Sequence, residues 1–327
     1  LHVRSRRQRQ MCIRDSVGDG QATIGDIGAE WAEDVANATF GAYDPESGKQ
    51  LIREIFVLIS KKNAKSTEAA SIMLTVLKMN WRKSAEILFL APTKEVADNA
   101  YNPARDMVKA DPKLDAMMQV QDHIRTIKHL GTGATLKVVA ADSNTVGGKK
   151  ATVVLVDEIH LFGKNPNAAK MLLEATGGLA SRPEGFVLYL TTQSDEPPAG
   201  VFASKLMYAR KVRDGEIVDP QFLPILYEFP KHMIESEAYL DPANFHMTNP
   251  NLGKSASIEF IEREIRRARE TGPHEMLIVL SKYLNVEIGM ALRTDRWAAA
   301  DFWLAQNNPL ITCLLYTSPS PRDLSTS

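Results

Sequence analysis

Five short aliphatic runs constrain the fold of this chain more than any other feature. Two of the stretches that separate these runs, residues 67–78 (TEAASIMLTVLK) and 95–110, are interpreted as helices. Short apolar strands that alternate with helices are typical of a mainly parallel sheet covered by helices on both faces. The sequence therefore predicts an α/β fold, with strands at residues 55–59, 87–90, 136–140, 153–156 and 187–190.

Both ends of the chain are expected to lie outside this fold. Residues 1–16 and 313–327 have neither helical nor strand periodicity. Met11 to Asp15 and Cys313 to Thr317 can be encoded by one DNA sequence and its reverse complement. The two tails therefore resemble translated sequencing adapters that flank a genuine segment, and we exclude them from the fold prediction.

The composition between the tails narrows the class of protein. Cys12 and Cys313 are the only cysteines, so disulfides and cysteine-based zinc sites are not expected in the segment between them. That segment is mildly acidic, which argues against strong nucleic-acid binding by bulk charge. No apolar run approaches the roughly 18 residues that a membrane span needs. We expect a soluble globular protein.

The stretch LISKKNAKST, residues 58–67, follows an expected strand and precedes an expected helix. This is the context of a phosphate-binding loop, G-x-x-x-x-G-K-[ST], whose backbone N–H groups face a phosphate. Lys65 would bind the β- and γ-phosphates and Ser66 would bind Mg²⁺. Ile59 and Ala64 replace the glycines, and an alanine with positive φ costs about 1 kcal/mol. Alone, the stretch fits a lysine-rich surface turn equally well.

A second cluster follows in ATVVLVDEIHLFG, residues 151–163. Asp157 and Glu158 come directly after a buried strand, at the end where open α/β sheets bind ligands. Asp157 would hold Mg²⁺ through water, and Glu158 would orient or deprotonate the attacking water. A solvated acidic turn is the alternative. His160 is expected to be structural, because no second histidine lies at ligand spacing.

Polar residues also end the run VLYLTTQS, residues 187–194. Thr191, Thr192 and Gln193 would lie near a bound γ-phosphate, although alone they fit an ordinary strand-end turn. The phosphate-binding loop and the acidic strand occur in the order that nucleotide hydrolases require. Together, the three clusters predict a hydrolase of nucleoside triphosphates that uses Mg²⁺.

The pattern changes after residue 199. Residues 222–227 (FLPILY) contain a proline, which suits an edge strand or an extended segment. Ser257 is placed to cap a helix with Ile258, Ile261 and Ile265 on one face. The charged residues of IEREIRRARE are interpreted as its solvated face. We predict an ATPase core over residues 17–199 and a smaller subdomain or linker over residues 200–295.

Over roughly residues 30–300 the chain resembles the ATPase half of the large terminase subunit of tailed bacteriophages. The resemblance rests on SKKNAKST, LFLAPTKEVADNA, VVLVDEIH, LYLTTQS and YLDPANFHMTNPNLG, in that order. It implies a P-loop NTPase fold of the RecA type. These subunits usually lack the first loop glycine, whereas Ala64 departs from their pattern and puts the catalytic rate in question more than the fold.

The resemblance also implies roles for individual residues. Lys61 stands where the family often has an arginine proposed to contact the γ-phosphate, and lysine keeps the charge but loses the bidentate fork. Asn249 to Leu252 match a family signature, which we interpret as a turn. Thr191, Thr192 and Gln193 match the segment that couples hydrolysis to DNA movement. The resemblance assigns nucleotide binding to Lys62, Asn63, Ala64, Lys65, Ser66 and Thr67.

The implied function is a motor that hydrolyses ATP to drive double-stranded viral DNA into a procapsid in the host cytoplasm. Implied partners are the portal protein, the small terminase subunit and further copies in a homo-oligomeric ring. The parent protein would also carry an RNase H-like nuclease domain, beginning just after Trp303. Residues 296–312 would be the start of the connection to that domain.

Two other functions fit the same residues. One is a helicase-like ATPase acting on nucleic acid, but the part after residue 200 looks too small for a second RecA-like domain. The other is an ATPase-like module that Ala64 has silenced. The presence of Lys65, Ser66, Asp157 and Glu158 argues against this loss.

Overall fold

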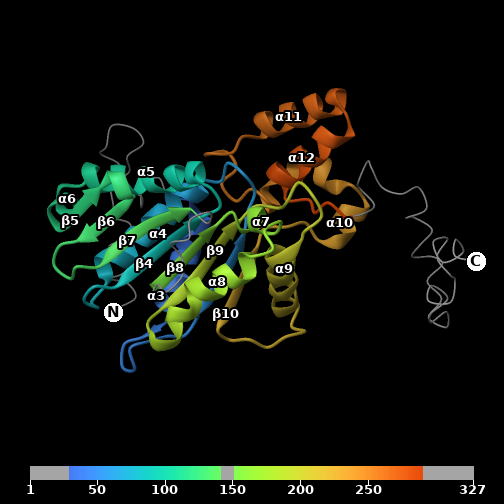
Figure 1. The fold of residues 1–327 in the computed structure, drawn as a ribbon. Coiled ribbons are helices and arrows are strands. Elements are labelled where there is room, and N and C mark those ends of the chain that lie inside the picture. Colours follow the sequence, from blue (N-terminus) through green and yellow to red (C-terminus); the bar gives the residue numbers. More distant parts are fainter. Residues whose placement is uncertain (1–28, 141–150, 290–327) are drawn as a thin grey trace, which may run out of the picture.

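All five aliphatic runs form strands of one eight-stranded sheet in the computed structural model, which describes residues 29–140 and 151–289 (Figure 1). Every residue of the last strand before Glu158 is buried, which explains why that run is apolar without alternation. The predicted α/β class is confirmed. The five strands are β3 (Glu54–Leu58), β4 (Glu86–Ala91), β7 (Thr135–Ala140), β8 (Ala151–Asp157) and β9 (Phe186–Thr191).

The sheet order is β10-β3-β9-β8-β4-β7-β6-β5. The strands from β10 (Phe222–Leu226) to β7 are parallel, whereas β5 (Met118–Gln121) and β6 (Thr126–His129) continue the sheet in antiparallel fashion. The carboxyl ends of the parallel strands therefore meet at one edge. As expected from Pro224, β10 is an edge strand.

Helices cover both faces of the sheet, as the alternation of side chains requires. On β3, Ile55 and Val57 join one hydrophobic cluster, and Phe56 and Leu58 join the other. The first cluster includes residues of α3 (Glu30–Gly41), α4 (Lys65–Met79) and α5 (Lys94–Ala110). The second includes residues of α7 (Ile159–Phe162), α8 (Ala168–Thr176) and α9 (Gly200–Arg213). Both predicted helices are confirmed as α4 and α5.

A third hydrophobic cluster begins at Phe229 and defines what we call the C-terminal subdomain, residues 229–288. It contains α10 (Lys231–Glu235), α11 (Ile258–Thr271) and α12 (Pro273–Leu284) and lies above the carboxyl edge of the sheet in Figure 1. We expected the core to end at residue 199. The structure differs, because α9 packs in the second cluster and β10 pairs with β3.

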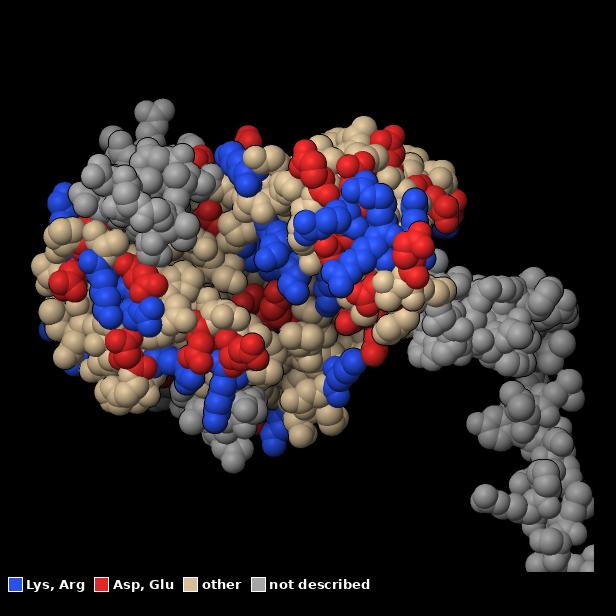
Figure 2. Space-filling model, turned by 90° about the horizontal axis from the view of Figure 1, so that it is seen from above, with Lys and Arg blue, Asp and Glu red and all other residues tan. Residues whose placement is uncertain are grey.

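The predicted cap of α11 is present, since the Ser257 side chain accepts a hydrogen bond from the Phe260 N–H. Ile261 and Ile265 are buried, but Ile258 is 37% exposed, so the predicted three-isoleucine face is wrong at its first position. Seen from above, lysine and arginine side chains gather over this subdomain (Figure 2). No helix in the described part of the chain is long and apolar enough to cross a membrane.

Two glycines let distant segments cross at van der Waals contact. A Cβ on Gly163, just after α7, would lie 2.6 Å from the Ala199 carbonyl oxygen. A Cβ on Gly200 would meet the Gly163 carbonyl oxygen, and Gly200 also has a φ of +53°. Larger residues would therefore push α7 away from the start of α9.

The smaller elements complete the described chain. A short hairpin follows α3, and α6 precedes β5. The tails expected at residues 1–16 and 313–327, the connection at residues 296–312 and Trp303 lie outside the described residues. The hairpin strands are β1 (Tyr43–Asp44) and β2 (Lys49–Gln50), and α6 is Pro112–Met117.

Candidate active site

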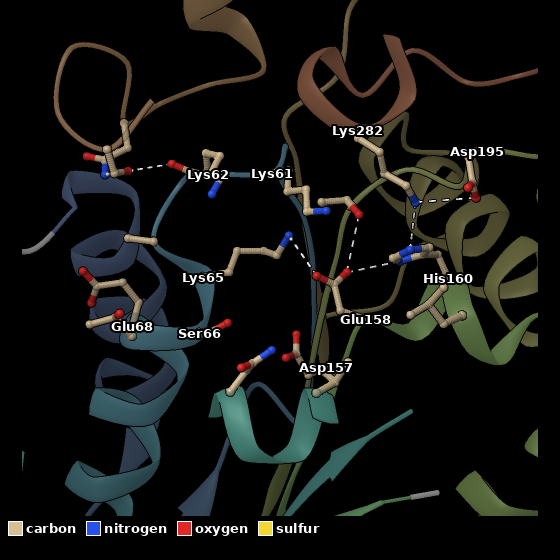
Figure 3. Close-up of a pocket in the computed structure, with 18 of the residues that line it drawn as sticks. Lys61, Lys62, Lys65, Ser66, Glu68, Asp157, Glu158, His160, Asp195 and Lys282 are labelled. Atoms are coloured by element: carbon tan, nitrogen blue, oxygen red, sulfur yellow. Dashed lines mark hydrogen bonds and ion pairs between the residues drawn. The ribbon is translucent and has the colours of Figure 1, made fainter. Parts of the chain in front are cut away.

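A cavity of about 1060 Å³ opens at the carboxyl edge of the parallel strands, below the C-terminal subdomain (Figure 3). Its walls include the β3–α4 loop, residues of α5 and α7, the end of β8, the residue after β9, and two segments of the C-terminal subdomain. Five lysines and four acids line it, so charges of both signs face the cavity. The charged residues are Lys61, Lys62, Lys65, Lys254, Lys282, Glu68, Asp157, Glu158 and Asp195.

The β3–α4 loop makes a tight turn that ends in a left-handed residue. Lys62 has a φ of 72° and Ala64 a φ of 62°. The condition under which alanine is costly at position 64 is therefore met. Lys65 then begins α4, so free backbone N–H groups of the helix N-terminus face the cavity.

Asn63 holds this loop from behind and is fully buried. Its side-chain Nδ2 donates to the Ser60 carbonyl at 3.0 Å and to Asn249 Oδ1 at 2.9 Å. Its Oδ1 accepts from the Asn251 N–H at 3.0 Å, and its own carbonyl accepts from Trp31 Nε1 at 3.1 Å. The loop is thus fixed both to α3 and to the C-terminal subdomain.

Lys65 and Glu158 face each other across the cavity. Lys65 Nζ lies 3.4 Å from Glu158 Oε1, and the lysine is only 7% exposed. Burial would raise the pKa of Glu158, but the charge of Lys65 and a hydrogen bond from His160 outweigh it and hold the pKa well below its usual range. Glu158 is therefore an ionised carboxylate within the cavity.

Asp157 ends β8 at the floor of the cavity and is 2% exposed. Its Oδ1 has no hydrogen-bond partner among the described residues. Burial, and then the charge of Glu158, raise its pKa to about 7. Ser66 points toward it from the start of α4 (Figure 3). A buried carboxylate oxygen without a partner, opposite a hydroxyl, fits the oxygen ligands that Mg²⁺ prefers.

His160 links the acids to the tip of β9. Its Nδ1 lies 3.2 Å from Glu158 Oε2 and 3.0 Å from Thr191 Oγ1. Its Nε2 lies 3.0 Å from Lys282 Nζ. Burial lowers the pKa of His160, which favours the neutral imidazole. Both ring nitrogens have protein partners, in keeping with the structural role expected for this residue.

The tip of β9 supports the wall of the cavity rather than forming much of it. The Thr191 hydroxyl donates to the Thr192 carbonyl at 2.9 Å, and the Thr192 hydroxyl donates to Glu158 Oε2 at 3.4 Å. The Gln193 N–H donates to Asn285 Oδ1 at 3.1 Å. This segment therefore contacts both Glu158 and the C-terminal subdomain.

Comparisons with known proteins identify the family of the chain. The profile of the family described as "Terminase large subunit, ATPase domain" matches residues 30–209, more than half of the chain. The chain belongs to this family. A search of curated proteins gave no match.

One solved terminase structure has the same fold. The large terminase of bacteriophage HK97 superposes with a TM-score of 0.70 at 18% identity, over 88% of this chain and 57% of that chain. The large terminase of a thermophilic bacteriophage was solved with ADP and with ATP-γ-S. Those complexes give TM-scores of 0.43 and 0.42 at 15% and 14% identity, over 65% of this chain and 50% and 49% of theirs. The chain thus spans just over half the length of the HK97 terminase.

Within this terminase ATPase domain, most of the residues predicted from the sequence meet in one cavity. Asn63, Thr191 and Gln193 are exceptions, because they lie behind the cavity wall and support it. The predicted residues that line it are Lys61, Lys62, Ala64, Lys65, Ser66, Thr67, Asp157, Glu158 and Thr192.

The contribution of the C-terminal subdomain to the site was not predicted from the sequence. Lys282 lines the cavity, and Asn249 is fully buried against the loop residue Asn63, where only a turn was expected. Ser255 also donates to the Lys62 carbonyl at 2.7 Å. The one available signal was Lys282 itself, the only charged residue in the mostly apolar stretch MLIVLSKYL.

Proposed function

We propose that this chain hydrolyses ATP in the cavity at the carboxyl edge of its sheet. The observation that carries the proposal is the meeting of Lys65 and Ser66, at the start of α4, with Asp157 and Glu158, at the end of β8, in one cavity. A lysine and helix N–H groups supply positive charge, and two carboxylates lie opposite.

The phosphates would bind over the β3–α4 loop. Lys65 would contact the β- and γ-phosphates as a point charge, and the N–H groups of Lys62 to Thr67 would donate to their oxygens. Ser66 and Asp157 would hold Mg²⁺, which neutralises phosphate charge when bound. Lys61, exposed at the rim, would approach the γ-phosphate.

Glu158 would act as the base toward the attacking water. Its only charged partner at the loop is Lys65 among the described residues, and triphosphate would compete with Glu158 for that lysine. Binding of the substrate would therefore free the carboxylate to accept a proton. Thr192 donates to Glu158, so release of Glu158 from Lys65 would shift Thr192 and, with it, Thr191 and Gln193.

The same site supports a role as the motor of viral DNA packaging. The family assignment and the HK97 fold support a chain that moves double-stranded DNA through a portal into a procapsid in the host cytoplasm. The small terminase subunit and other copies of the chain in a ring would be its partners. A nuclease domain would belong to the longer parent protein.

A first test compares the wild type with Lys65→Ala in phosphate release and in binding of a fluorescent ATP analogue. We expect affinity to fall about 100-fold, since a charge-assisted contact to phosphate is lost. Lys231→Ala, at a 90% exposed lysine of α10, is the matched control and should change neither value. Equal affinity in both variants would contradict the phosphate site. Binding without turnover in the wild type would favour the silent module.

A further inference from the structure

The C-terminal subdomain brings two lysines to the cavity, exposed Lys254 and the less exposed Lys282. Lys282 lies near the end of α12 and its side chain is 14% exposed. Its Nζ lies 3.0 Å from His160 Nε2, 3.3 Å from the Gln193 carbonyl oxygen and 3.6 Å from Asp195 Oδ1 (Figure 3). All three partners belong to the core.

The contact with Lys282 decides which imidazole nitrogen carries the proton. A lysine ammonium can only donate, so His160 Nε2 must accept, and the proton of the neutral ring lies on Nδ1. Thr191 Oγ1 donates its own proton to the Thr192 carbonyl and can only accept from the ring. The Nδ1–H therefore points at Glu158 Oε2 and Thr191 Oγ1.

We propose that Lys282 is a positioning residue that orients Glu158 through His160, so that the catalytic centre is complete only when the C-terminal subdomain is docked. The inference rests on the proposed role of Glu158 as the base. Removal of Lys282 leaves both tautomers of His160 open, and in the other tautomer Nδ1 carries no proton to donate to Glu158.

The backbone around Lys282 shows how docking sets its position. The Lys282 carbonyl accepts from the Lys61 N–H at 2.7 Å, which joins the end of α12 to the phosphate-binding loop. Asn285 accepts from the Gln193 N–H at 3.1 Å and donates to the Tyr227 carbonyl at 2.9 Å. The end of α12 is thus fixed to the loop and to the β9 tip on either side of the cavity.

The test measures kcat for ATP and the Kd of a non-hydrolysable ATP analogue in the full chain. For Lys282→Met and for His160→Gln we expect kcat to fall about 10- to 100-fold, as for loss of an orienting contact, with Kd within about twofold. The double variant should lose little more than either single one, because both remove the same chain of contacts. Lys282→Arg, which still donates to His160, should recover part of kcat, and Lys231→Met should match the wild type.

Three outcomes would overturn the inference: unchanged kcat in Lys282→Met, fully additive losses, or a Kd that rises as much as kcat falls, which would make Lys282 a phosphate ligand. Glu158→Gln separates this from the proposed function. If Glu158→Gln keeps its turnover, the assignment of Glu158 as the base fails. If Glu158→Gln loses turnover but Lys282→Met and His160→Gln keep it, only the role of Lys282 fails. If Lys282→Met does not fold, Asn285→Ala tests the same docking, with lower kcat expected and unchanged kcat contradicting it.

Discussion

Ala64 holds a backbone conformation that alanine disfavours, at the point where the phosphate-binding loop enters α4. With φ at 62°, its Cβ is crowded by the backbone, and glycine would relieve this. We expect Ala64→Gly to raise the free energy of unfolding by about 1 kcal/mol, measured by denaturant titration, and to increase ATP turnover. Ala116→Gly, at an exposed helical position in α6, should instead lose about 1 kcal/mol. The same sign for both variants would contradict strain at residue 64.

Glu158 is the residue whose removal should separate binding from chemistry. Glu158→Gln keeps the shape of the side chain but cannot accept a proton as a carboxylate does. We expect ATP turnover to fall about 10²- to 10⁴-fold while analogue binding persists, measured by phosphate release and by titration. Glu196→Gln, at an exposed acid paired with Lys164, serves as the control. Turnover that survives in Glu158→Gln would remove it from the role of base.

Site residues were predictable where a charged or hydroxyl side chain lies directly beside a strand or helix that the sequence identifies. Lys65 and Ser66 stand between a strand and a helix, and Asp157 and Glu158 follow a buried strand, so short stretches identify them. The φ of Ala64 was not predictable, because it depends on how Asn63 is held by residues far along the chain. Lys282 was missed for the same reason: its role arises from contacts with His160 and Gln193.

The strands in the middle of the sheet and the edge strand β10 were predicted well, whereas β5 and β6 at the other edge were not. β8 and β9 are buried on both faces and read as continuous apolar runs. β5 and β6 are antiparallel strands of only four residues each, too short for an alternation of apolar and polar residues to identify them. α9 was missed as part of the core because its buried stripe is short, Phe202, Leu206 and Ala209.

The cap of α11 offers a test of one element alone. Ser257 satisfies the Phe260 N–H, one of the free donors at the helix start. We expect Ser257→Ala to lower the free energy of unfolding of the C-terminal subdomain by about 1 kcal/mol in denaturant titration. Ser204→Ala, at an exposed serine within α9, should lie within about 0.5 kcal/mol of the wild type. An equal loss in the two variants would argue against the cap.

At the scale of the whole molecule, the core and the C-terminal subdomain share the walls of one cavity. Asn63 and Lys62 bond to Asn249, Asn251 and Ser255, so an opening of that interface would also release the phosphate-binding loop. Bound nucleotide should therefore oppose this opening.

Hydrogen exchange would measure this link. With a non-hydrolysable ATP analogue at 100 times its Kd, we expect amides in residues 249–255 and 282–286 to exchange up to about 100-fold more slowly. Amides of β5 and β6, at the far edge of the sheet, supply the internal control. Protection confined to the β3–α4 loop would show that the subdomain does not sense the nucleotide.

The crossing of Gly163 and Gly200 has a consequence for how mutational data on this chain would be interpreted. Neither glycine lines the cavity, yet any side chain there would displace α7, which carries His160. In a saturation map of tolerated substitutions, positions 163 and 200 would be as intolerant as Lys65 or Asp157. Positions where two backbones need space would then look like catalytic positions in such a map. Only nucleotide-binding data would distinguish the two kinds of position.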